Sequence, residues 1–164
     1  MSDLIDDPGV IEKALRLVTV AVGTIRTDNG YKNTVLYVGR ELPGENDLES
    51  LAIPAAFVVR RPGSRSPIEW RDGDVYGEQL DVDLIGYIRT DGRKAADFGL
   101  AGRGEAMVSD FKKLAMADPH FGDRFTIHNS RIVDSGNDGG TYDGITAVCG
   151  IGLILQLYFD GVNP

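Results

Sequence analysis

The chain has 164 residues and a formal charge of -8, because 25 Asp and Glu outnumber 17 Lys and Arg. This balance disfavours tight binding to DNA or RNA, which needs a basic face that releases counterions. A hydrophobic fraction of 42% excludes wholesale disorder and, at this length, favours one domain over residues 1–164.

The first element is predicted to be an amphipathic helix. Asp7 is a suitable cap, and Pro8 suits the first helical position because its missing N–H would be unpaired there. Gly23 is expected to end the helix, after apolar residues at helical spacing: Val10, Ile11, Ala14, Leu15, Val18 and Val22. A short β-rich stretch, Thr34–Val38, and an acidic connection, Pro43–Leu51, follow.

The middle of the chain is predicted to form strands. Ile53–Val59 is a strand candidate with a proline near its start, where proline is tolerated. The basic stretch Arg60–Ser66 contains a Pro-Gly pair and is expected to form a turn or a hairpin tip, with Ile68–Trp70 as the returning arm. Val75–Thr90 is the best long strand, and its alternation predicts one face that is wet or meets a partner: Leu80, Val82, Leu84 and Ile88 against Gln79, Asp81 and Asp83.

A second helix is expected between Ala95 and Ala117, ended by Asp118-Pro119. Two more strands, Phe125–Val133 and the apolar Ile145–Phe159, flank a glycine-rich loop at Ser135–Gly144. This order predicts an α+β fold: a mixed or mainly antiparallel sheet, two main helices packed on one face, and an extended hairpin or loop. The longest apolar segment falls short of the ~20 residues of a membrane helix, so no membrane partner is expected.

No motif points to a metal or a cofactor. Gly99–Gly104 has the glycine spacing of neither a dinucleotide fingerprint nor a Walker loop, and helix packing or a helix start explains it. Three aspartates in the glycine-rich region, Asp134, Asp138 and Asp143, could hold Ca²⁺ through oxygen ligands. An EF-hand loop starting at Asp134 would need a ligand at Gly136 and a Glu at Ile145, so it fails both tests.

One pair of carboxylates could serve catalysis. Asp81 and Asp83 would project from one strand face with Cα atoms ~6.6 to 6.8 Å apart, a separation open to a paired-carboxylate hydrolase. Alternating acids on a wet strand face are the commoner explanation. His120 and His128 lack the spacing of zinc motifs, and Cys149 lies in an apolar run where buried inert cysteine is common. We therefore expect no enzyme and keep Asp81 and Asp83 as interface candidates.

The basic stretch supplies further interface candidates: Arg60, Arg61 and Arg65. They form either a solvated hairpin or an arm that pairs with acidic surface on a neighbouring subunit. The negatively charged Pro43–Leu51 connection could supply that acidic surface. Trp70 is either an interface anchor, because Trp is enriched at hot spots, or a core residue.

Several stretches together resemble the tail-terminator (tail-completion) proteins of long-tailed bacteriophages. They are Ala14-Leu15-Arg16-Leu17, Asp28-Asn29-Gly30-Tyr31, Val38-Gly39-Arg40, Leu51-Ala52-Ile53-Pro54-Ala55, Gly86-Tyr87-Ile88, Leu114-Ala115-Met116-Ala117-Asp118-Pro119 and Leu157-Tyr158-Phe159. The similarity covers nearly the whole chain as an order of elements.

The resemblance implies a structural virion protein without catalytic residues, assembled in the host cytoplasm and located at the head-proximal end of the tail. It implies a homo-oligomeric ring, usually a hexamer, that caps the tail tube protein and offers a surface to a head-completion or neck protein. DNA would only pass through the channel, which an acidic protein suits because like charges repel. Alternatives are a neck connector of the same head–tail interface, a small hydrolase using Asp81 and Asp83, and a monomeric ligand-binding module.

Overall fold

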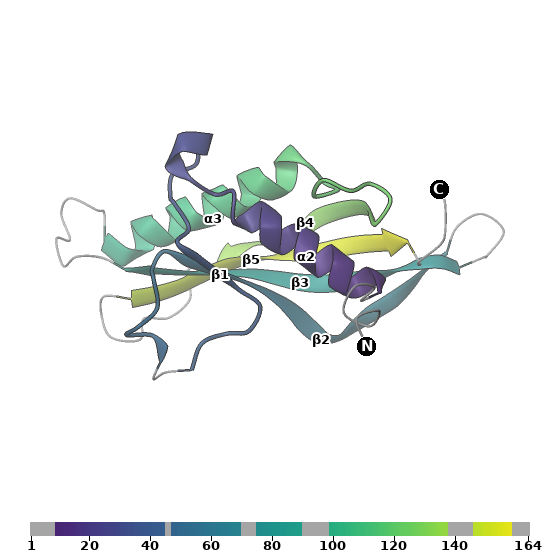
Figure 1. Cartoon of the computed structure of the whole chain (residues 1–164), viewed down its shortest axis with the longest axis horizontal. Coiled ribbons are helices and arrows are strands. Elements are labelled where there is room, and N and C mark those ends of the chain that lie inside the picture. Colours follow the sequence, from purple (N-terminus) through teal and green to yellow (C-terminus); the bar gives the residue numbers. More distant parts are fainter. Residues whose placement is uncertain (1–8, 45–46, 70–74, 90–98, 138–145, 159–164) are drawn as a thin grey trace, which may run out of the picture.

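A mixed five-stranded sheet forms the centre of the computed structural model, which describes residues 9–44, 47–69, 75–89, 99–137 and 146–158 (Figure 1). Its order is β1-β2-β3-β5-β4, with bounds Tyr37–Gly39, Ala55–Glu69, Val75–Arg89, Thr146–Tyr158 and Ile127–Asn137. The short β1 runs parallel to β2, and all other neighbours are antiparallel. The predicted α+β class is confirmed.

Two helices cover one face of this sheet, as the sequence predicts. They are α2 (Val10–Val22) and α3 (Gly99–Ala117), and both cross the same side of the strands in Figure 1. A single turn, η1 (Thr27–Asn29), follows α2. The helix α3 packs on β3, β4 and β5, whereas α2 packs mainly on β2, β5 and β1.

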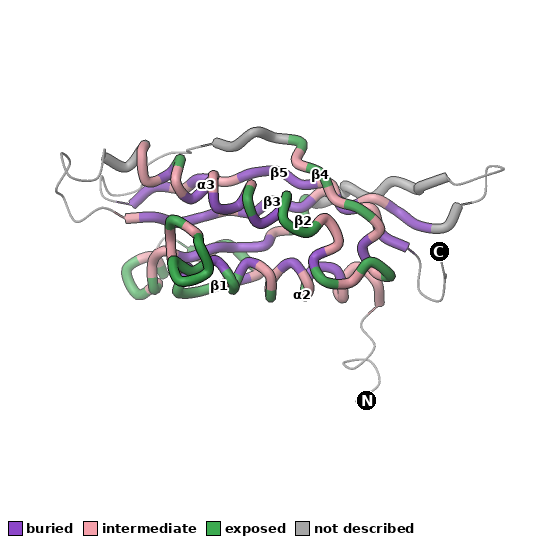
Figure 2. The backbone as a smooth tube through the Cα atoms, turned by 90° about the horizontal axis from the view of Figure 1, so that it is seen from above, coloured by how far each residue is buried: buried purple, intermediate pink, exposed green. Residues whose placement is uncertain are grey.

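The main core lies between the helices and the sheet. Alternate residues of β3 and β5 face the helices and pair across the two strands: Leu80 with Leu155, Val82 with Leu153, and Leu84 with Ile151. Gly86 continues this row under α3, where an added Cβ would lie 2.7 Å from Met107 Cγ. Glycine is therefore what allows α3 to approach β3 this closely. Figure 2 shows the buried backbone along β3 and β5.

The second face of the sheet is covered at one end by the segment that links β1 to β2. Ala55, Phe57 and Tyr87 form a separate buried cluster, against which Leu48, Leu51 and Ile53 pack. Arg89 of β3 attaches this segment to the sheet, because its Nη2 donates a hydrogen bond of 3.3 Å to the Leu48 carbonyl. The acidic connection is thus attached to the sheet face opposite the helices.

The predicted hairpin tip at Arg60–Ser66 is wrong. β2 runs on through this stretch to Glu69 and accommodates the Pro-Gly pair as an irregularity in its pairing with β3 between Arg60 and Arg65. Ile68 and Glu69 therefore belong to the same strand and not to a returning arm. The extended hairpin is formed by β2 and β3, whose connection, residues 70–74, lies outside the described residues.

Several element ends differ from the predictions. α2 starts at Val10 with Gly9 as its N-cap, and the predicted cap and first helical residue, Asp7 and Pro8, lie outside the described residues. The β-rich stretch near Thr34 is reduced to β1. β4 starts at Ile127 because Asp123 holds the preceding residues in a turn, and it runs to Asn137, into the predicted glycine-rich loop. Gly23, Ala117 and the limits of β3 and β5 agree to within one residue.

Candidate docking surfaces

Asp81 and Asp83 project from the sheet face opposite the helices, as predicted. Asp83 Oδ1 accepts a hydrogen bond of 2.6 Å from Nη2 of Arg61, and these side chains are 27% and 47% exposed. Asp81 lies on the same strand face, opposite Ile154 of β5. Neither carboxylate lines the two grooves described below. The structure therefore places Asp83 in a surface ion pair with Arg61.

The other basic-stretch candidates are spread along β2. Arg60 is exposed at the start of the irregular region, and Arg65 lies opposite Leu80 of β3. Trp70 lies outside the described residues. The structure therefore brings Arg61 to Asp83, and it separates Arg65 from Arg60 along the strand.

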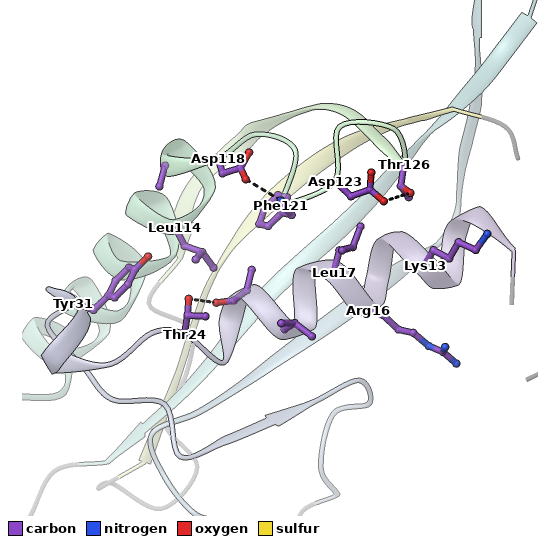
Figure 3. A pocket seen from close by; sticks show the side chains of 14 residues that line it. Lys13, Arg16, Leu17, Thr24, Tyr31, Leu114, Asp118, Phe121, Asp123 and Thr126 are labelled. Carbon is purple, nitrogen blue, oxygen red and sulfur yellow. Dashed lines mark hydrogen bonds between the residues drawn. The ribbon is translucent and has the colours of Figure 1, made fainter. Parts of the chain in front are cut away.

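A groove of about 740 Å³, which we call the helix groove, lies between α2 and the end of α3 with the loop that follows it (Figure 3). One wall is a stripe of α2 residues at helical spacing, Lys13, Arg16, Leu17, Val20 and Ala21, continued by Thr24 just after the helix. The other wall comes from the end of α3 and the following loop, with Leu114, Phe121 and Thr126. Val20 is 72% exposed and adds apolar surface to this wall.

The loop wall of the helix groove is held in place by two aspartates. Asp118 accepts hydrogen bonds from the backbone N–H groups of His120 and Gly122, both at 2.9 Å. Asp123 accepts from the Phe125 N–H at 2.9 Å and from the Thr126 hydroxyl at 2.8 Å. Between them, Phe121 has a φ of 48° and is only 6% exposed. This left-handed conformation is costly for a non-glycine residue. The hydrogen bonds of Asp118 and Asp123 stabilise the loop in the conformation that places Phe121 in the groove wall.

Tyr31 closes one end of the helix groove and is fixed from α3 (Figure 3). The carboxylate of Asp110, 2% exposed, accepts hydrogen bonds from the N–H groups of Lys32 and Asn33 and from Asn33 Nδ2 at 2.8 to 2.9 Å. Lys113 Nζ lies 4.9 Å from the centre of the Tyr31 ring and donates to the Gly30 carbonyl at 2.7 Å. Burial, followed by the Asp110 charge, raises the pKa of Tyr31.

A second groove of about 620 Å³ lies on the opposite side of α2, which we call the edge groove. It contains Leu42, 49% exposed, together with Arg60, Val59, Ile11 and Leu15. Glu12 accepts two hydrogen bonds of 3.1 Å from Arg40 and lies 3.4 Å from Arg16. The Arg40 hydrogen bonds hold the pKa of Glu12 below its ordinary value. This network links α2 to the segment after β1.

The two histidines contact hydrogen-bonding groups of the fold, and the cysteine is buried. His120 Nδ1 lies 3.0 Å from the Ile127 carbonyl, and His128 Nδ1 lies 2.5 Å from the Tyr158 hydroxyl. Cys149 is buried beneath α3. In the described part of the chain, no cluster of three or more His, Cys, Asp or Glu side chains could hold a metal ion. No helix there is long and apolar enough to cross a membrane.

The groove residues were not singled out from the sequence, although a signal was present. The core stripe of α2 was read correctly, since Ala14, Leu15, Val18 and Val22 are buried. Leu17 and Ala21 flank that stripe and pack partly against the same core, whereas Val20 is exposed. Val20, an apolar residue away from the core side of the helix, is therefore the signal that the sequence offers for this groove.

Comparisons with known proteins give little identity. No protein-family model matches the chain, and no curated protein matches it. Among solved structures, a chain described as belonging to the virion of a native gene transfer agent (GTA) particle aligns with a TM-score of 0.44 and 11% identity, covering 92% of each chain. A likeness at this TM-score does not establish a shared function.

Proposed function

We propose that this chain is a structural virion protein that assembles as a ring, caps the end of a phage tail tube, and offers a surface for head–tail joining. The proposal rests on the tail-terminator resemblance and on an element order that agrees with it: helix, hairpin of long strands, helix, two strands. It concerns assembly and requires no catalytic residue.

The observation that carries the proposal is the asymmetry of the subunit's sides. One edge strand of the sheet is β4, and the other is the short β1, which pairs with β2 only from Ala55 to Phe57. The two flanks of α2 also differ, one forming the helix groove and the other the edge groove. A cyclic ring needs two different complementary patches on each subunit, and unlike sides can supply them.

The charges support a tube-capping role with DNA passing through. A net charge of -8 repels the nucleic acid backbone, so DNA would slide through such a ring without being held. The face opposite the helices combines Asp81 and Asp83 with Arg61, so it carries charges of both signs. Mixed charges of this kind favour specific contact with other subunits over general attraction to an acidic polymer.

The test is the mass of the purified chain in solution, measured by light scattering over a concentration series, with and without tail tubes of the cognate phage. We expect a ring-sized species, either alone or on adding tubes, and electron microscopy should place it at one tube end. A chain that stays monomeric at all concentrations and ignores the tubes would contradict the proposal. Binding to isolated necks but not to tubes would favour the neck-connector alternative.

A further inference from the structure

We draw no further inference here: the strongest candidate, the helix groove between α2 and the end of α3, has two acidic and two basic side chains in its largely apolar walls, and nothing in the structure shows what covers it.

Discussion

Replacing Asp110 should be among the most damaging single changes to the fold outside the apolar core. This buried carboxylate accepts three hydrogen bonds, from the Lys32 and Asn33 backbone and from Asn33 Nδ2. It ties α3 to the segment that carries Tyr31, some 77 to 78 residues earlier in the chain. In Asp110→Ala, the two backbone N–H groups lose their acceptor and nothing in the new side chain replaces it.

The expected loss of unfolding free energy for Asp110→Ala is about 3 kcal/mol. Hydrogen bonds to charged groups contribute about 1.5 to 3 kcal/mol each, and a buried donor left unpaired costs about 1 to 3 kcal/mol. These terms do not add in full, because they share one carboxylate, and relief from burying a charge offsets part of the loss. For a chain of this size the loss corresponds to a fall in Tm of roughly 6 to 12 °C.

The assay is urea unfolding followed by circular dichroism, with the slope m compared between variants. Asn33→Ala should cost about 1 kcal/mol, since it removes only the side-chain hydrogen bond. Glu105→Ala is the surface control on the same helix and should change stability by less than about 0.5 kcal/mol. If Asp110→Ala costs no more than Glu105→Ala, Asp110 does not clamp this segment.

Three further expectations follow from single contacts. Gly77→Ala should destabilise the fold by about 1 to 3 kcal/mol in the same unfolding assay, because the added Cβ would lie 1.9 Å from the Leu157 carbonyl oxygen. Gly44→Ala is the control and should be nearly neutral, because the atom nearest to its added Cβ is 3.5 Å away. Glu12→Gln should cost less than about 1 kcal/mol at pH 7, since the ion pair is part-exposed. Because Arg40 lowers the pKa of Glu12 from 4.5, the difference between wild type and variant should shrink as pH falls through that lowered pKa. Tyr31 should titrate above 10.0 by NMR of labelled tyrosine, and Asp110→Asn should move its pKa back toward that value.

Each of these expectations has a contrary result. Equal losses for Gly77→Ala and Gly44→Ala would show that β3 and β5 can separate at this point without cost. A difference between wild type and Glu12→Gln that grows on acidification would reverse the sign of the Arg40 interaction. If Asp110→Asn does not change the pKa of Tyr31, burial alone accounts for the raised pKa.

The elements that the sequence predicts well are those with one dominant periodicity. β3 alternates, β5 is a continuous apolar run, and the core stripe of α2 repeats at helical spacing, so their limits agree with the structure to within a few residues. The fold class follows from the order of these elements. Such local patterns need no knowledge of what each face packs against.

The basic stretch shows where local signals fail. Pro62-Gly63 is a strong turn signal, yet β2 continues past it because β3 supplies a long partner and the mismatch is absorbed between Arg60 and Arg65. Tertiary pairing thus overrides a local turn preference. The same pairing places Arg61 against Asp83, so two candidates proposed separately belong to one ion pair.

The structure places the two oppositely charged candidates on different faces of β2. Arg60 pairs with Val82, whose side chain belongs to the core under the helices, and it lines the edge groove. The acidic connection packs on the opposite face, through Leu48 and Leu51. A ring contact requires two different patches on each subunit, so pairing of the basic stretch with this connection stays a prediction.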